Sequence, residues 1–207
     1  MHFSIILPVL NEEAVLERSL SHLARVGMSH TYEVVLVDGG SQDQTLSIAR
    51  RFGRVIQAPR GRAIQMNKGA EIASGEIYLF LHADTLLPVN AFAAIERACA
   101  SREVVGGAFH LAFDCNTLAY RLVALATNLR SQWRGIFTGD QGLFVRADSF
   151  KAIGGFPDIA LMEDLEIVTR LRQRGKVVLL PDAATTSARR HQKLGLARSV
   201  LFMWYLR

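Results

Sequence analysis

Apolar residues recur along the first half of the chain in short runs that are typical of buried strands. The runs cover Phe3 to Val9, Glu33 to Val37, Arg54 to Ala58 and Ile77 to Leu81. The last run is continuously apolar, which favours a strand buried on both faces of a parallel sheet. The pattern therefore predicts four strands in this half.

Three helices are predicted between these strands. The first is expected to have Asn11 as its N-cap and to end at Gly27, and Ser41 is expected to cap the second. The third is predicted from Ala63 to Ala73. An alternation of strands and helices with short connections predicts right-handed crossovers, and hence a parallel sheet with helices on both sides.

The second half of the chain continues with both kinds of element. Strands are predicted from Val104 to Phe113, from Leu143 to Val145 and from Val177 to Leu180. Gly106 and Gly107 interrupt the first of these, which indicates a bulge or the close approach of a ligand. Helices are expected after Pro88, after Asp164 and over the stretch described next.

Five large apolar residues recur at helical spacing in the middle of the second half. They are Leu118, Leu122, Leu125, Leu129 and Trp133. One apolar face of this kind is most often the face that a helix packs against its own domain. We therefore expect packing, with binding of an acceptor as the alternative.

Polar side chains follow four of the predicted strands at the point where each strand ends. They fall in the segments Pro8 to Glu12, Asp38 to Ser41, Arg60 to Arg62 and His82 to Asp84. Because the carboxyl ends of parallel strands meet at one rim, where ligands bind in open α/β sheets, these segments are expected to lie together. Carboxylates, arginines and glycine-flanked amides suit a nucleotide diphosphate with its metal.

His82 and Asp84 are two residues apart and so share one face of a strand end. The pair can hold a divalent cation. The other interpretation is a strand terminus at which Asp84 caps the next turn.

Composition limits the classes of protein and partner. The 207 residues are half hydrophobic and contain no linker, which predicts one domain. A net charge of +5 indicates an anionic partner, and because the arginines are scattered we do not expect nucleic acid. No signal peptide is evident, and Cys99 and Cys115 lack metal or redox spacing, so a cytoplasmic location is expected.

Several motifs, in order, resemble those of a family 2 glycosyltransferase with the GT-A fold, and the likeness covers nearly the whole chain. The motifs are Ile5 to Glu13, Val37 to Asp43, His82-Ala83-Asp84, Gly154-Gly155-Phe156 and Glu163-Asp164. Residues Arg62, Gln65, Met66 and Asn67 and the sequence His-Ala-Asp-Thr are similar to a small bacterial branch of that family. The resemblance implies a single GT-A domain over 1–207, with a mostly parallel central sheet. About 1–105 would bind the nucleotide sugar and about 106–207 would carry the acceptor site and the catalytic base.

The resemblance also implies a role for each site residue. It assigns the nucleotide sugar to Pro8, Asn11, Glu12, Asp38, Gly40, Arg62, Asn67 and Ala83, and the acceptor to Asp140 and Gln141. Asp164 would be the catalytic base, with Glu163 orienting the acceptor. The metal, Mn²⁺ or Mg²⁺, would be bound by Asp84, His82 and His191, with a solvated basic loop as the alternative for the segment that contains His191. His82 replaces the first acid of the usual D-x-D motif, so a structural hydrogen bond is the alternative role for it, and a simple turn is the alternative for Asp140 and Gln141.

The implied activity is metal-dependent, inverting transfer of a sugar from a UDP-sugar or GDP-sugar to a hydroxyl acceptor, which includes a lipid-linked one. The alternatives are a nucleotidyltransferase and a non-catalytic nucleotide-binding module. The apolar segment from Leu194 to Arg207 is too short to span a bilayer. It is expected to pack on the domain, to join a homodimer, or to lie as a peripheral contact on the inner face of the membrane.

Overall fold

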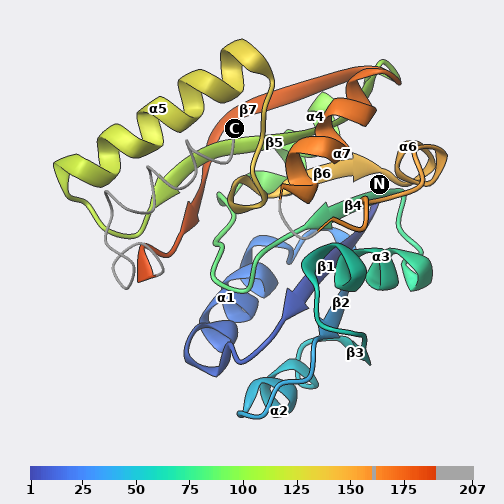
Figure 1. Cartoon of the computed structure of the whole chain (residues 1–207), viewed down its shortest axis with the longest axis vertical. Helices are drawn as coiled ribbons and strands as arrows, with labels where there is room; N and C mark the ends of the chain where they lie inside the picture. Colours follow the sequence, from blue (N-terminus) through green and yellow to red (C-terminus); the bar gives the residue numbers. More distant parts are fainter. Residues whose placement is uncertain (160–161, 190–207) are drawn as a thin grey trace.

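The computed structural model describes residues 1–159 and 162–189, and in this part of the chain seven strands form one sheet in the order β3-β2-β1-β4-β6-β5-β7 (Figure 1). The strands are β1 (His2–Val9), β2 (Thr31–Asp38), β3 (Arg54–Gln57), β4 (Ile77–Phe80), β5 (Val104–Phe113), β6 (Leu143–Arg146) and β7 (Lys176–Thr186). The helices are α1 (Glu13–Val26), α2 (Thr45–Ala49), α3 (Arg62–Ile72), α4 (Ala91–Ala98), α5 (Leu118–Arg134), the short 3-10 helix η1 (Gly139–Gln141), α6 (Ala147–Ala152) and α7 (Glu163–Arg172).

The first four strands form the parallel half of the sheet. Ile5 of β1 pairs with Val34 of β2 and with Leu79 of β4, so β1 lies between its two partners. A helix follows each of β1, β2 and β3 before the next strand, as right-handed crossovers require. The predicted α/β fold with a mostly parallel sheet is confirmed.

The second half of the sheet is mixed. Strand β6 is antiparallel to both β4 and β5, and β7 is parallel to β5. Strand β6 therefore enters the sheet between two strands that precede it in the chain. Its antiparallel direction places the residues just before it, the η1 turn, at the rim where β1 and β4 end.

Apolar side chains fill both faces of the sheet. Successive residues of a strand point to opposite faces, and Ile5 accordingly packs with residues of α1 and α4, whereas Ile6 packs with residues of α3, α6 and α7. The predicted strand that begins at Ile77 is buried along its whole length, because helices cover both of its faces. This explains why the run contains no polar residue.

Two predicted helix caps are wrong. Helix α1 begins at Glu13, and the Oδ1 atom of Asn11 instead accepts a hydrogen bond from the N–H of Gln42 at 2.8 Å. The Oγ atom of Ser41 accepts the N–H of Asn11 at 3.0 Å. Both side chains connect the β1–α1 loop to the β2–α2 loop, a long-range use that competes with capping and cannot be seen locally.

The glycine pair of β5 marks a bulge, as predicted, because the pairing with β7 shifts between Val104 and Gly106. The close approach at this point is between neighbouring strands. A Cβ atom on Gly107 would lie 2.3 Å from the carbonyl oxygen of Val178. Glycine is therefore required for β7 to pair with β5, and β7 continues to Thr186, well past the predicted end of that strand.

Helix α5 does not pack its large apolar residues on the domain. Leu118 is 71 % exposed and Trp133 is 81 % exposed, while Tyr120 and Ser131 form the buried side. The predicted packing of this face is wrong. In the described residues no helix combines the length and hydropathy needed to cross a membrane. The predicted C-terminal helix from Leu194 to Arg207 lies outside the described residues.

Candidate functional site

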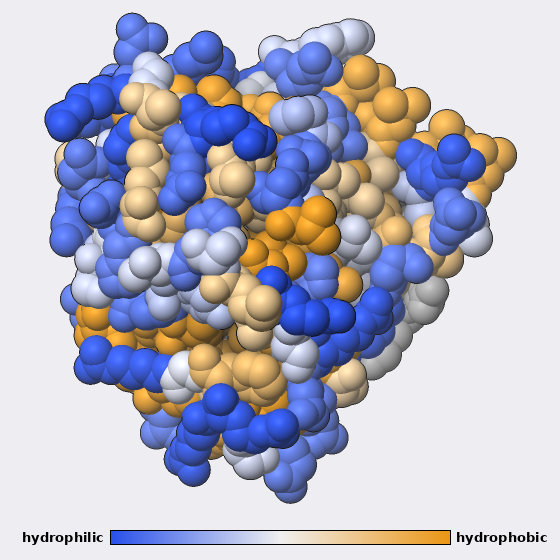
Figure 2. Space-filling view, turned by 180° about the vertical axis from the view of Figure 1, so that it is seen from behind, coloured by the Kyte–Doolittle hydropathy of each residue, from blue (hydrophilic) through white to orange (hydrophobic). Residues whose placement is uncertain are grey.

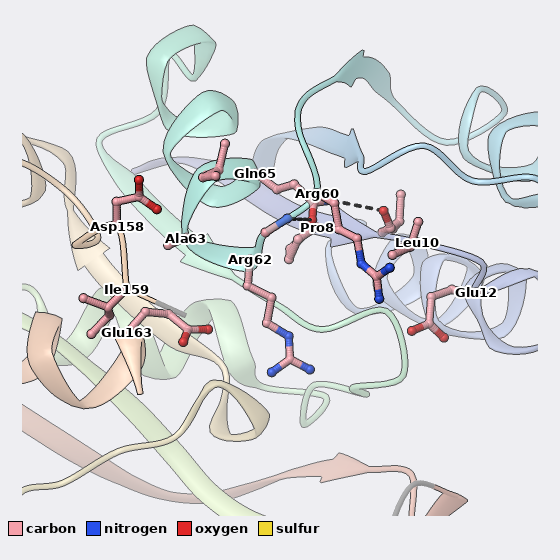
Figure 3. Close-up of a pocket in the computed structure, with 13 residues that line it drawn as sticks. Pro8, Leu10, Glu12, Arg60, Arg62, Ala63, Gln65, Asp158, Ile159 and Glu163 are labelled. Carbon is pink, nitrogen blue, oxygen red and sulfur yellow. Dashed lines mark hydrogen bonds between the residues drawn. The ribbon is translucent and has the colours of Figure 1, made fainter. Parts of the chain in front are cut away.

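A cavity of about 700 Å³ opens at the carboxyl ends of β1 and β3, beside the start of α3 (Figure 3). Its lining comes from the β1–α1 loop, the start of α3 and the segment before α7. The lining residues are Pro8, Val9, Leu10, Glu12, Arg60, Gly61, Arg62, Ala63, Ile64, Gln65, Asp158, Ile159 and Glu163. Four predicted site residues, Pro8, Glu12, Arg62 and Glu163, are thus brought to one cavity.

Two arginines give the cavity a basic wall. Helix α3 begins at Arg62, directly after Gly61, whose φ of +149° few other residues adopt. Figure 3 shows Arg60 and Arg62 extending into the cavity, with Arg62 between Glu12 and Glu163. A helix start with free N–H groups and two guanidinium groups nearby is suited to bind phosphate.

Gln65 fixes the start of α3 against the sheet. Its buried Nε2 atom donates hydrogen bonds to the carbonyl oxygens of Val9 at 3.0 Å and Val37 at 2.7 Å. Both carbonyls belong to the ends of β1 and β2, and that of Val9 also accepts the backbone N–H of Gly39 at 2.9 Å. From the sequence, Gln65 was named only as one of the residues that resemble the family, and no role was predicted for it. A polar residue on the buried face of a helix was the signal for this role.

Asp38 closes a turn at the end of β2. It is fully buried, and its carboxylate accepts the N–H of Gly40 at 2.9 Å and the N–H of Ser41 at 3.1 Å. Gly40 has a φ of +96°, which favours glycine. Contacts of Asp38 and Gly40 with a nucleotide stay a prediction, and what the structure adds is that Asp38 holds the loop on which Gly40 lies.

Glu12 joins the first loop of the chain to its last described residue. Its Oε2 atom lies 2.6 Å from a terminal nitrogen of Arg189, and the Glu12 side chain is only 13 % exposed. The pair lies beside the cavity, because Glu12 is one of the residues that line it. Glu12 therefore lines the cavity and also links the β1–α1 loop to the residues after β7 through its ion pair with Arg189.

Asn67 and Ala83 lie in places that limit direct contact with a nucleotide sugar. Both ends of the Asn67 amide are used by the backbone of Phe156, which donates to Oδ1 at 2.9 Å and accepts from Nδ2 at 2.8 Å. Ala83 is buried, and its carbonyl oxygen accepts a hydrogen bond from Ser19. We leave both residues outside the proposed donor site, since Asn67 holds the loop before α7 and Ala83 belongs to the core.

His82 is held by Asp140. The Nδ1 atom of His82 lies 2.7 Å from Oδ1 of Asp140, and the His82 side chain is 11 % exposed. On the other side of the ring, a Cβ atom on Gly139 would lie 2.5 Å from Nε2. Both ring nitrogens are thus covered by the η1 segment. This geometry favours the structural role of His82 over the predicted metal ligation, and it uses Asp140 as the partner of His82.

Asp164 lies in the first turn of α7, next to the same η1 segment. Its Oδ2 atom accepts the N–H of Gly139 at 2.8 Å, and its Oδ1 atom accepts the N–H of Leu165 at 2.9 Å. Asp164 also lies close enough to His82 and Asp140 for their charges to act on it. The three side chains come from the loop after β4, from η1 and from α7, so the fold alone brings them together.

Burial raises the pKa of the Asp164 carboxyl above its ordinary range. The hydrogen bond from Gly139 lowers this pKa in part, and the negative charge of Glu163 raises it again. Smaller contributions come from His82, which lowers the pKa, and Asp140, which raises it. A carboxylate with raised proton affinity is a better general base than an ordinary aspartate.

The predicted acceptor contact of Gln141 is wrong. The side chain is fully buried, with Nε2 donating to the carbonyl of Phe109 at 3.0 Å and Oε1 accepting the N–H of Thr138 at 3.0 Å. All of its polar capacity is spent inside the protein. Gln141 thus forms the η1 turn, which was the alternative interpretation.

Asp84 follows β4 and lies beside the end of β7, near Asp114, Thr185 and Ser187. The described residues contain no group of three or more His, Cys, Asp or Glu side chains that could hold a metal ion. Among the described residues, a cation would therefore have at most two such side chains as protein ligands, and Asp84 is the predicted one. Magnesium is commonly bound by one or two carboxylates together with substrate phosphates, and this donor set fits that pattern. The predicted ligand His191 lies outside the described residues.

Comparison with known proteins agrees with this arrangement. Residues 4–154 match the family described as Glycosyl transferase family 2. A PGL/p-HBAD biosynthesis glycosyltransferase of Mycobacterium bovis is 37 % identical over 161 residues, which cover 73 % of this chain and 57 % of that protein. The chain thus spans little more than half the length of this relative.

Two solved structures show the same fold. S. aureus TarS, in complex with UDP-GlcNAc, has a TM-score of 0.69 at 19 % identity. The alignment covers 90 % of this chain and 58 % of the TarS chain. A mannosyltransferase from Pyrobaculum calidifontis, in complex with GDP-Man and Mn²⁺, has a TM-score of 0.67 at 24 % identity, with coverages of 88 % and 56 %. With its parallel half, its rim cavity and the match over residues 4–154, the chain belongs to glycosyl transferase family 2.

Proposed function

We propose that this protein transfers a sugar from a nucleotide diphosphate donor to an acceptor hydroxyl, with inversion at the anomeric carbon. The observation that carries the proposal is the Asp164 carboxylate, whose pKa is raised, beside a cavity with a basic wall. A single base on one side and a phosphate-binding wall on the other are the two parts that a one-step displacement requires.

The donor is assigned to the cavity at the start of α3. Its diphosphate would lie against Arg60, Arg62 and the first N–H groups of the helix, where charge on the leaving group is stabilised. Pro8 and Glu12 line the same space. The relatives in complex with UDP-GlcNAc and GDP-Man support a nucleotide sugar of either kind as the donor.

The acceptor is assigned to the side where η1 meets α7. Asp164 would accept the proton of the acceptor hydroxyl as that oxygen attacks the anomeric carbon, and Glu163 would orient the acceptor from the cavity wall. Asp140 would act through His82 and fix the η1 turn, whose Gly139 N–H holds Asp164. The turn would thereby keep the base in one position.

Asp84 is the residue that we assign to a divalent cation, Mn²⁺ or Mg²⁺. When bound, such an ion would neutralise negative charge on the diphosphate. The support is the carboxylate of Asp84 at the end of β4, in the place of the second acid of a D-x-D motif, and Mn²⁺ in the related mannosyltransferase structure.

Asp164→Asn tests the proposal. We expect kcat to fall by about two to four orders of magnitude, because a general base acts only in the transition state, while donor affinity stays within about twofold. Asn can accept only one of the two N–H groups that Asp164 binds, so the melting temperature must be measured beside turnover. Glu166→Gln, on the exposed side of α7, is the matched control.

The product distinguishes the alternatives. Sugar transfer releases a nucleoside diphosphate, whereas nucleotidyl transfer releases pyrophosphate, and a binding module releases neither. Parental turnover in Asp164→Asn would mean that the base lies elsewhere, with Glu163 and Asp140 as the next carboxylates to replace.

A further inference from the structure

Helix α5 presents its large apolar residues to solvent. Leu118, Leu122, Leu125, Leu129 and Trp133, here called the α5 stripe, are exposed by 71, 55, 55, 38 and 81 % respectively. At 3.6 residues per turn the five side chains fall within an arc of about 80° on one side of the helix. In Figure 2 hydrophobic residues gather at the upper right, over α5, between polar ones.

The orientation of α5 is fixed by polar contacts on its other side. The amide of Asn128 accepts the N–H of Leu111 at 2.7 Å and donates to the carbonyl oxygen of the same residue at 3.0 Å. Ser131 donates to the carbonyl oxygen of Ile136 at 2.8 Å. These bonds hold α5 on β5 with the α5 stripe facing outward. An exposed apolar surface of this size on a fixed helix marks a site of interaction.

The charges beside the α5 stripe are positive. Helix α5 contains three arginines and no aspartate or glutamate, and Arg121 and Arg134 are both exposed. Arg172 of α7 donates to the carbonyl oxygen of Arg134 at 2.7 Å, which brings another guanidinium group to the C-terminal end of the helix. The surface around the α5 stripe is therefore complementary to negative charge.

We propose that the α5 stripe binds the surface of a membrane that contains anionic lipids. A row of leucines, a tryptophan at one end and arginines beside them are the parts of a helix that lies in the plane of the lipid interface. The leucines would enter the boundary of the acyl chains, and Arg121 and Arg134 would reach the head groups. This binding does not depend on the proposed sugar transfer.

The buried side of α5, opposite the α5 stripe, contacts the η1 turn. Ser131, on the buried side of α5, also donates to Oε1 of Gln141 in η1 at 3.2 Å. The η1 turn in turn holds Asp164 through Gly139. Binding through the α5 stripe would thus attach to the lipid surface the same helix that contacts the turn holding the proposed base.

Co-sedimentation with vesicles tests the proposal. The protein is mixed with vesicles of phosphatidylglycerol and phosphatidylcholine, and separately with vesicles of phosphatidylcholine alone. We expect binding to the anionic vesicles, about tenfold weaker binding for Leu122→Gln/Leu125→Gln, and a similar loss for Arg121→Gln/Arg134→Gln. Val89→Gln, which replaces an apolar side chain that is 84 % exposed elsewhere, is the matched control and should bind as the parent does.

A second measurement locates the contact. The chain has two tryptophans, so Trp204→Phe leaves Trp133 as its only one. The emission of Trp133 should shift to shorter wavelength on anionic vesicles, because the ring leaves water. No shift, with binding retained, would assign the membrane contact to another part of the chain and overturn the proposal.

The remaining outcomes point to other occupants and would also overturn it. If Leu122→Gln/Leu125→Gln lowers the melting temperature and the parent does not bind vesicles, the α5 stripe packs against another part of this chain. If the double variant instead converts a dimer to a monomer in analytical ultracentrifugation, the occupant is a second copy.

Discussion

The proton affinity of Asp164 is set by its burial, by its sequence neighbour Glu163 and by residues distant in the chain. Burial and the charge of Glu163 raise its pKa, and the N–H of Gly139, 25 residues away in the chain, opposes them. This balance makes Asp164 a stronger base while a hydrogen bond still fixes its position. A change in any of these neighbours should therefore appear in the pH dependence of turnover.

Glu163→Gln should shift the acid limb of the kcat/KM profile to lower pH. A raised pKa means that Asp164 holds its proton to a higher pH than an ordinary aspartate, so the active, deprotonated form is lost at higher pH as the solution is acidified. Removing the negative charge of Glu163 lowers that pKa. Glu166→Gln, whose carboxylate pairs with Arg170, should leave the limb in place. An unmoved limb in Glu163→Gln would show that another group titrates.

His82→Asn should leave the preference between Mn²⁺ and Mg²⁺ unchanged. Nδ1 of His82 is bound to Asp140, and an asparagine amide can donate from nearly the same position. Asp84→Asn provides the contrast, since it should abolish metal-dependent binding of UDP or GDP without loss of the fold. Titration of each variant with both metals measures the two effects. A changed metal preference in His82→Asn would restore His82 as a ligand.

The sequence identified most of these residues but few of their partners. Asp164 was selected through the family resemblance, whereas His82 and Asp140 could be selected because polar residues at strand ends and turns are chemically conspicuous. Their pairing could not, because 58 residues separate His82 from Asp140 and the contact depends on β6 entering beside β4. Asn67 was assigned to the nucleotide sugar through the resemblance, although its amide is used by Phe156.

At the scale of elements, helix α3 positions the basic wall of the cavity. Its anchor is Gln65, which bonds to the carbonyl groups at the ends of β1 and β2. The anchor is internal to the fold, and its loss should affect both stability and donor binding.

Gln65→Leu should lower the free energy of unfolding by about 1–3 kcal/mol, because the buried carbonyl oxygens of Val9 and Val37 lose the Gln65 donor and only Val9 keeps the N–H of Gly39. Donor affinity should fall with it, since the start of α3 would shift. Urea denaturation and nucleotide titration measure the two quantities. The matched control is Gln173→Leu, at an exposed helix end, which should change stability by less than about 0.5 kcal/mol. Equal stability of the parent and Gln65→Leu would contradict the anchoring role.

Helices and strands could be predicted from the sequence where burial alone determines the pattern of apolar and polar residues. The strand that begins at Ile77 is an example, since both of its faces are covered. Helix α5 shows the limit of this reasoning. Helical spacing of Leu118 to Trp133 correctly predicted a helix, but periodicity does not state which side faces the protein, and here Asn128 and Ser131 decide it.

On the scale of the whole molecule, the sheet joins two halves that play different parts in the proposed function. The parallel half, β1 to β4, carries the basic cavity, and the mixed half carries η1 and α7 with the proposed base. The two meet where β6 pairs with β4. Parallel order in the first half followed from the succession of strands and helices, whereas insertion of β6 is a long-range pairing without a local signal.

The ion pair between Glu12 and Arg189 joins residues 177 positions apart, and this has a consequence for synthesis on the ribosome. Strands β1 to β4 leave the ribosome first and can pair as they emerge, yet β4 keeps an open edge until β6 is made. Glu163, which lines the cavity, and Arg189, which pairs with Glu12, are synthesised after β6. The proposed donor cavity is therefore complete, with Glu163 in its wall and Glu12 paired to Arg189, only after residue 189 has emerged.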